Sequence, residues 1–169
     1  MKIGIKNCRD LFNKLIFEKE RLESSWSDYD FFNFVVTAWH LQNDWLKNNK
    51  ENRPKLAMRK INTTPEDMKE VINIARDIAN GSKHFKLDAP SEEKRVVTEV
   101  HPAEIKDWHS YFFGPKPAIS TTKSYYSVAD FSYLITEYFK WLFNDSESAK
   151  HLPESIRKHL DRAKKSKPK

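Results

Sequence analysis

The chain contains little glycine, a single cysteine and no long apolar run. Three glycines among 169 residues, together with 13% aromatic residues, disfavour a glycine-punctuated β-barrel and favour a helical body. Cys8 alone cannot form an intrachain disulfide or a CxxC metal site, which suits the reducing cytoplasm. No stretch offers the roughly 20 apolar residues that a membrane span needs, and the N-terminus lacks a signal-peptide pattern. We therefore expect a soluble, cytoplasmic protein of one domain.

The formal charge of +6 is confined to the C-terminal end of the chain. Of the 30 basic and 24 acidic residues, 23 of each kind precede residue 157. We therefore predict a helical domain over residues 1–156 and a basic tail over residues 157–169. Such a tail either binds polyanions in a salt-sensitive way or is simply a solvated terminus.

Hydrophobic periodicity predicts a mainly α fold, a bundle of four to five helices. Ser27 is a candidate N-cap for the second helix, and Thr64 followed by Pro65 marks the start of the third. Apolar residues cover more than half of the second helix, so we expect that helix at the centre of the bundle. The predicted helices cover residues 8–22, 29–49, 65 to about 79, 127–143 and 153–165.

Residues 88–124 interrupt the helical pattern. Their four prolines exclude a long helix, while RVVTEV and HSYFF are short β-like runs. We predict an insertion here, a β-hairpin between the third and fourth long helices that packs against the bundle. Within it, the aromatic segment 108–113 either packs on the bundle or forms a protein-binding surface.

The stretch ARDIANGSKHFKL gathers polar groups at the end of the third predicted helix. On a helical wheel Arg76, Asn80 and His84 fall on one side, next to the apolar stripe. Alternatively, the Asn80-Gly81 pair ends the helix near Ala79, and the turn formed by residues 80–84 presents Lys83, His84 and backbone N–H groups to an anion. Ordinary hydrogen-bonded side chains at the edge of a core would give the same pattern.

A second polar pair lies on the second predicted helix. His40 and Asp44 are four residues apart and share a face, so the carboxylate can orient the imidazole for acid–base chemistry. If this face turns toward the third helix, both residues would join Arg76, Asn80 and His84 in one cleft and contact the substrate there. The alternative is a partly buried pair with no chemical role.

A helical bundle in which one helix carries an arginine, then a polar residue, then a histidine resembles the HEPN superfamily (higher eukaryotes and prokaryotes nucleotide-binding). Many members are metal-independent ribonucleases of toxin, antiphage and RNA-processing systems that act in a dimer cleft through an R-x(4–6)-H motif. The matching residues are Arg76, Asp77, Asn80 and His84. Seven residues separate Arg76 from His84, which places their backbones about 12 Å apart along a helix, whereas Asn80 lies about 6 Å from His84.

The resemblance implies an endoribonuclease that acts as a homodimer and needs neither a metal nor another cofactor. His84 would exchange a proton with the ribose 2′-hydroxyl, as general acid or base. Arg76 and Lys83 would stabilise charge on the phosphate, and Asn80 would position it. We therefore expect a HEPN-like protein of a bacterial or phage defence or toxin system that binds or cleaves RNA.

Three other functions compete with this hypothesis. The first is a non-enzymatic adaptor or immunity protein that binds a protein partner through residues 108–113. The second is a metal hydrolase with His40, Asp44 and His84 as ligands, although the chain has no H-E-x-x-H motif. The third is nucleic-acid binding through residues 157–169.

Overall fold

The computed structural model describes residues 4–50, 53–81, 95–101 and 117–166. It confirms the mainly α fold. None of the described helices is both long enough and apolar enough to cross a membrane. The helices are α1 (Cys8–Ser24), α2 (Asp28–His40), the π-helix η1 (Leu41–Lys47), α3 (Ala57–Asn62), α4 (Glu66–Gly81), α6 (Val128–Leu142), the 3-10 helix η3 (Glu147–Ala149) and α7 (Glu154–Lys165).

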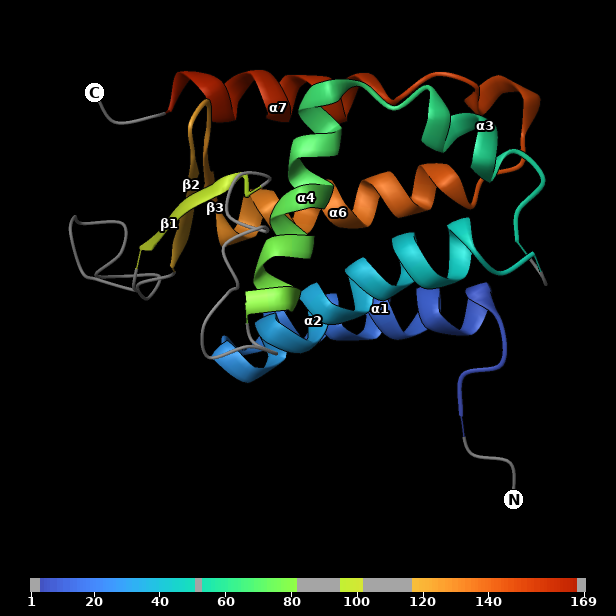
Figure 1. Cartoon of the computed structure of the whole chain (residues 1–169), viewed down its shortest axis with the longest axis horizontal. Coiled ribbons are helices and arrows are strands. Elements are labelled where there is room, and N and C mark those ends of the chain that lie inside the picture. The colour runs from blue at the N-terminus through green and yellow to red at the C-terminus, as the bar shows by residue number, and fades with distance from the viewer. Residues whose placement is uncertain (1–3, 51–52, 82–94, 102–116, 167–169) are drawn as a thin grey trace.

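The long helices form a bundle that one helix crosses. Helices α1, α2, α6 and α7 run roughly along the long axis of the molecule, and α4 lies across them (Figure 1). Helix α4 packs against both α2 and α6. The start of α4 therefore lies close to α7, and its end lies over α2 (Figure 1).

Side-chain caps fix the starts of three helices. Asn7, Ser27 and Ser127 each accept a hydrogen bond from the backbone N–H three residues later, at 3.0, 3.4 and 3.0 Å. This confirms the N-cap predicted at Ser27. The cap predicted at Thr64 is not formed: no described backbone N–H of α4 donates to the Thr64 hydroxyl, which donates to the carbonyl oxygen of Lys60 (2.9 Å) at the end of α3 and lies 3.3 Å from the Tyr138 hydroxyl.

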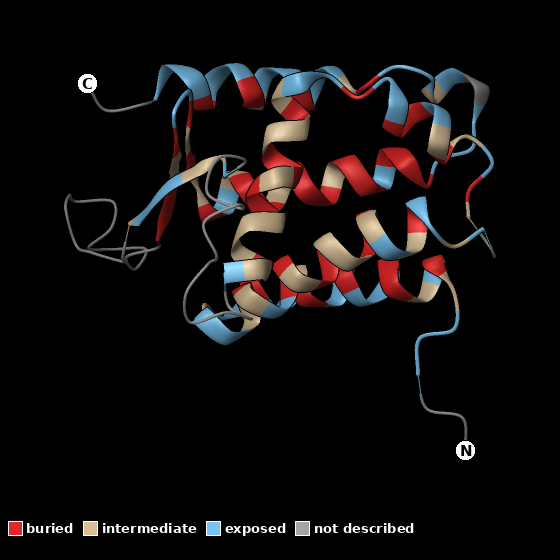
Figure 2. Cartoon of the chain, viewed as in Figure 1, coloured by how far each residue is buried: buried red, intermediate tan, exposed pale blue. Residues whose placement is uncertain are grey.

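The central helix is α6 and not the second helix predicted from the sequence. Ten of the fifteen residues of α6 are buried, against five of thirteen in α2. The difference arises because α1, α3, α4 and α7 all pack on α6, whereas one side of α2 remains partly open (Figure 2). The periodicity of α2 alone could not reveal how many neighbours each helix has.

A three-stranded antiparallel sheet covers one end of the bundle. Its strands are β1 (Val97–His101), β2 (Ala118–Thr121) and β3 (Tyr125–Ser127), in the order β1-β2-β3. Ile119 of β2 pairs with Tyr126 of β3, and both side chains are buried. The sheet is therefore anchored to the core through β2 and β3, and β3 leads directly into α6.

The sheet corresponds to the predicted insertion but extends beyond it. The first predicted run, residues 95–100, overlaps β1. The second run, residues 109–113, lies outside the described residues, and the partner of β1 is β2. The antiparallel pairing of β1 with β2 agrees with the predicted hairpin-like insertion, and a third strand, β3, extends the sheet past the expected end at residue 124.

The segment expected as a basic tail is mostly helical. Helix α7 runs through the predicted boundary at residue 156, and its Ile156 and Leu160 are 0% and 3% exposed. Lys164 also forms an ion pair with Asp67 in the first turns of α4. Residues 157–165 therefore belong to the folded domain, with their basic side chains on the outer face of α7.

Candidate functional site

The second predicted helix changes geometry halfway along its length. Helix α2 gives way to η1, in which backbone hydrogen bonds join residues five apart. Gln42 and Lys47 are therefore stacked on one face. The end of η1 is held by Arg53, whose Nη1 donates to the carbonyl oxygens of Leu46 (3.1 Å) and Lys47 (3.5 Å). The sequence predicted a uniform α-helix here, because no residue pattern marks a π-helix.

A cavity of about 630 Å³ lies between η1, α3 and α4. Its size falls within the range of small-molecule sites in proteins. The residues that line it include Trp39, Gln42 and Lys47 from α2 and η1, Lys69 and Arg76 from α4, and Tyr138 from α6. The cavity therefore lies beside the contact of α4 with α2, where the end of α2 and η1 face α3 and α4.

The cavity is strongly basic. Lys47, Lys69 and Arg76 line it, and no Asp or Glu stands among the described lining residues. Lys69 is 44% exposed and binds the exposed Glu66 at 2.6 Å, outside the lining. Arg76 is likewise paired with Asp77, outside the lining, whereas Lys47 makes no ion pair with the described residues. Because the lining itself contains cations and no described carboxylate, the site favours an anionic ligand, chiefly through Lys47.

Asp77 holds Arg76 and fastens the sheet to α4. Its Oδ1 accepts from Nε (2.9 Å) and Nη2 (2.7 Å) of Arg76, and its Oδ2 accepts from the backbone N–H groups of Val96 (2.7 Å) and Val97 (3.2 Å). Nη1 of Arg76 donates to Asn73 at 3.2 Å. The guanidinium is therefore fixed against α4 by two side chains, at the edge of the cavity.

A chain of buried polar groups forms another wall of the cavity. Nε2 of Gln42 donates to the Tyr138 hydroxyl at 3.4 Å, and that hydroxyl lies 3.3 Å from Oγ1 of Thr64. Since Thr64 donates its own proton to Lys60, Tyr138 is the donor to Thr64. Burial raises the pKa of Tyr138 to about 12, against the opposing effect of these hydrogen bonds, so the phenol stays protonated near neutral pH.

One hydrogen-bond acceptor in this row of buried polar side chains has no partner among the described residues. Oε1 of Gln42 is buried and has no hydrogen-bond partner among the described residues. Buried polar atoms are nearly always paired in folded proteins, because an unpaired one loses its hydration without compensation. Gln42 is 4% exposed and lines the cavity, so the unpaired oxygen lies on a residue of the basic cavity itself.

His40 and Asp44 are brought together, but outside the cavity. Nδ1 of His40 contacts the Asp44 carboxylate, and the two side chains are 36% and 47% exposed. Asn43 also donates to this carboxylate at 3.0 Å. Neither His40 nor Asp44 lines the cavity that contains Arg76, so the described structure does not bring them together in one cleft.

The remaining predicted site residues follow Arg76 along the chain. Asn80 lies one turn after Arg76 on α4, is partly buried and does not line the cavity. Helix α4 continues to Gly81 and so does not end at residue 79. Lys83, His84 and the aromatic segment 108–113 lie outside the described residues.

The described residues contain no group of three His, Cys, Asp or Glu side chains that could hold a metal ion. The hypothesis of a metal hydrolase also requires His84, which is not described. It therefore stays a prediction, with the His40–Asp44 pair as its described part.

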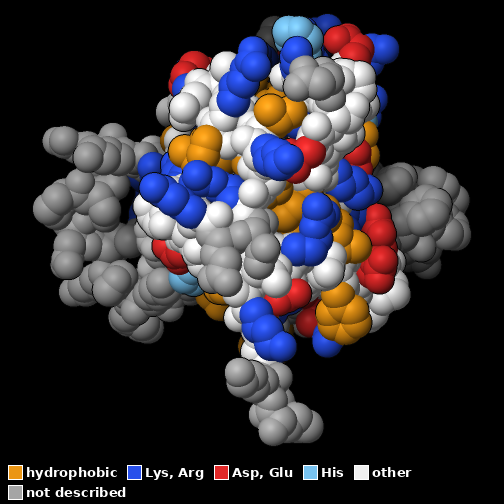
Figure 3. Space-filling model, turned by 90° about the vertical axis from the view of Figure 1, so that its right-hand side faces the viewer, with side chains coloured by type: hydrophobic (Ala, Val, Ile, Leu, Met, Phe, Trp, Pro, Cys, Tyr) orange, Lys and Arg blue, Asp and Glu red, His pale blue; other side chains and the backbone are white. Residues whose placement is uncertain are grey.

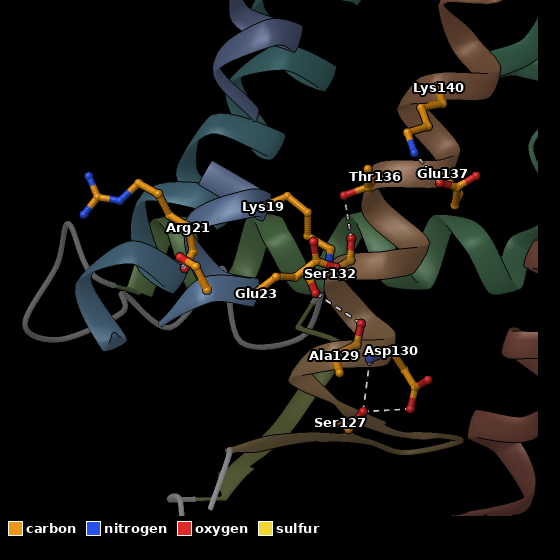
Figure 4. Close-up of polar contacts among 11 residues, drawn as sticks. Lys19, Arg21, Glu23, Ser127, Ala129, Asp130, Ser132, Thr136, Glu137 and Lys140 are labelled. Atoms are coloured by element: carbon orange, nitrogen blue, oxygen red, sulfur yellow. Dashed lines mark hydrogen bonds and ion pairs between the residues drawn. The ribbon is translucent and has the colours of Figure 1, made fainter. Parts of the chain in front are cut away.

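A second cavity, of about 370 Å³, lies between α1, α6 and α7 and has a different chemistry. Lys19 lines it but is paired with Glu23 on α1. Ser127, the N-cap of α6, donates to the Asp130 carboxylate at 2.7 Å (Figure 4). With Glu23 and Asp130 in its lining, this cavity is less suited to an anion than the basic cavity.

The basic cavity adjoins a surface rich in cations. The face that carries α3 exposes Lys and Arg side chains around apolar patches, with Asp and Glu side chains between them (Figure 3). Residues 47–60 contain six Lys and Arg and one Glu. Lys47 was not among the residues selected from the sequence; this local run of charge marks the segment as basic but does not show which of its cations lines a cavity.

Comparison with protein families, with curated proteins and with solved structures finds no match for this chain.

Proposed function

We propose that this protein binds RNA through the basic cavity between η1, α3 and α4. The observation that carries the proposal is that Lys47, Lys69 and Arg76 line this cavity while no Asp or Glu stands among its described lining residues; the carboxylates that pair with Lys69 and Arg76 lie outside the lining. RNA phosphates are the abundant anions that such a site would attract, and Lys and Arg contacts with phosphate supply most of the affinity of nucleic-acid complexes. Arg76 is held by Asp77 and Asn73, so this cation is fixed before the ligand arrives.

We further propose that the bound strand is cleaved without a metal ion, as the HEPN resemblance implies. Arg76 lines the cavity, and Asn80 follows it by one helical turn, so a polar ridge leads along α4 toward the residues after Gly81. His84 would act there as general acid or base. This activity would place the protein in the cytoplasm, in a bacterial or phage defence or toxin system, with a homodimer supplying a second copy of the motif.

Binding is tested by titrating a short labelled single-stranded RNA at several salt concentrations. The double variant Lys47→Ala/Lys69→Ala should weaken binding and reduce the slope of log K against log salt by about 1 for each phosphate that is no longer bound by a cation. The matched control is Arg157→Ala/Lys158→Ala, which removes two exposed cations from α7. If only this α7 variant weakened binding, the basic face of α7 would be the RNA site and the cavity proposal would be wrong.

Cleavage is tested separately with His84→Ala. We expect this variant to bind RNA with unchanged affinity, keep its melting temperature and lose cleavage, while a chelator leaves the wild-type activity intact. Cleavage by the His84→Ala variant would show that the histidine has no part in the chemistry.

A further inference from the structure

We propose that the basic cavity takes one entire nucleotide, with its base inserted and unstacked from its neighbours, and does not bind only backbone phosphates. This inference rests on the proposed RNA binding and concerns the part of the strand that enters. A site for phosphate alone would need cations and backbone N–H groups. The cavity has cations, but it also has apolar walls, and one of its lining residues, Gln42, carries a buried amide oxygen without a hydrogen-bond partner among the described residues.

The charged residues that line the cavity are more exposed than the buried polar residues Gln42 and Tyr138. Lys47 is exposed and the Lys69 side chain is 44% exposed, whereas Gln42 and Tyr138 are 4% and 1% exposed. The cations therefore lie nearer to solvent than the amide and the phenol. A nucleotide has the same order of groups, with a charged phosphate at one end and a base with polar edges at the other.

The apolar walls suit the faces of a base. Trp39, Ile61 and Ile72 line the cavity, and Trp39 is also packed against the core, which restricts the motion of its ring. Bases stack readily on aromatic side chains in single-strand binding proteins, largely independently of sequence. A volume of about 630 Å³ is in the range of pockets that enclose small molecules, so it matches a nucleotide and excludes a duplex.

Gln42 supplies the polar contact that a base would need. Its Oε1 lacks a partner among the described residues, and its Nε2 makes only a long hydrogen bond of 3.4 Å to Tyr138. Every RNA base carries at least one N–H group on its Watson–Crick edge, and single-stranded RNA is commonly recognised through these edges. An inserted base would therefore give the Gln42 amide its missing partner after a rotation of the side chain.

The test compares three ligands of equal length: a single-stranded RNA, an abasic strand with the same sugar–phosphate backbone, and a duplex. The single strand should bind about tenfold more tightly than the abasic strand, the gain expected when one base stacks on an aromatic ring. The duplex should bind more weakly than the single strand, because its bases are already stacked and paired. A nucleoside monophosphate should displace the single strand, whereas inorganic phosphate at the same concentration should not.

Three variants, one at Gln42 and two at Trp39, test whether the tighter binding of the single strand comes from this cavity. Gln42→Leu should weaken binding of the single strand about fivefold and leave the abasic strand unchanged, because one hydrogen bond is lost. Trp39→Leu should act in the same way, and Trp39→Phe should retain binding because it keeps an aromatic face. Gln42→Leu removes an unpaired buried oxygen, so its melting temperature should not fall, and folding is checked by that measurement.

The outcomes separate this inference from the proposed function. If no strand binds, the proposal of RNA binding is wrong, and the proposal of an inserted base is wrong as well. If the abasic strand binds as tightly as RNA and Gln42→Leu changes neither affinity, RNA binding stands and only the inserted base is wrong. If the nucleoside monophosphate alone binds as tightly as the strand, the ligand is a free nucleotide and RNA binding is wrong.

Discussion

Removal of the Asp77 carboxylate should destabilise the fold and weaken the cavity at the same time. In the Asp77→Ala variant, Arg76 loses its two hydrogen bonds to Oδ1, and the N–H groups of Val96 and Val97 lose their acceptor. The Asp77 side chain is 7% exposed and that of Arg76 is 24% exposed, so water can replace these contacts only in part.

The expected magnitude follows from these contacts. Hydrogen bonds to a charged group contribute about 1.5–3 kcal/mol each, and removal of one partner of a buried ion pair costs about 3–5 kcal/mol. Because Arg76 is partly exposed, we expect Asp77→Ala to lower the free energy of unfolding by about 3 kcal/mol. Asp77→Asn keeps the shape and one carbonyl acceptor, so its loss should be about half as large.

Urea denaturation followed by circular dichroism measures these changes. Asp161→Ala is the matched control, because Asp161 is an exposed aspartate on α7, and it should change stability by less than about 0.5 kcal/mol. RNA affinity should fall in Asp77→Ala because Arg76 is no longer held at the cavity. A free energy of unfolding for Asp77→Ala equal to that of Asp161→Ala would show that Asp77 neither anchors the sheet nor holds Arg76.

Two further predictions concern the core. Leu160→Ala on α7 should lower the free energy of unfolding by about 2–4 kcal/mol in urea titrations, because Leu160 is 3% exposed; an unchanged stability would show that α7 is a detachable tail. Tyr138 has its pKa raised from 10.0 to about 12, so its contribution to stability should be constant below pH 10 and fall as the pH rises toward 12, because the unfolded chain releases this proton first. Tyr138→Phe should reduce that fall, which unfolding titrations at successive pH values would measure, and an identical pH dependence would contradict the shift.

The long helices could be predicted because their signals are local. Ser27 caps α2 through its own hydroxyl, and α6 combines a helical apolar stripe with a serine cap. The short elements could not be predicted in this way. Helix α3 has only six residues, and its Lys60 donates to the carbonyl oxygens of Trp141 and Asn144 at the end of α6, a tertiary contact. Strand β3 has three residues, too few to show an alternating pattern.

The candidate site was only partly visible in the sequence, for a related reason. Arg76 could be selected because it lies beside the apolar stripe of an ordinary α-helix. Lys47 could not be selected, because the π-helix determines which way its side chain faces. Nothing in the sequence pointed to Gln42, whose burial only the structure shows. His40 and Asp44 met as their spacing predicted, but the crossing of α2 by α4 leaves them outside the cavity.

Photo-crosslinking of single-stranded RNA to the wild-type protein, with mass spectrometry of the crosslinked peptides, tests the RNA site most directly. We expect crosslinks in two segments far apart in the sequence, residues 39–47 of α2 and η1 and residues 69–76 of α4, because both line the same cavity. Crosslinks confined to residues 154–165 of α7, with none in either cavity segment, would contradict RNA binding at this site.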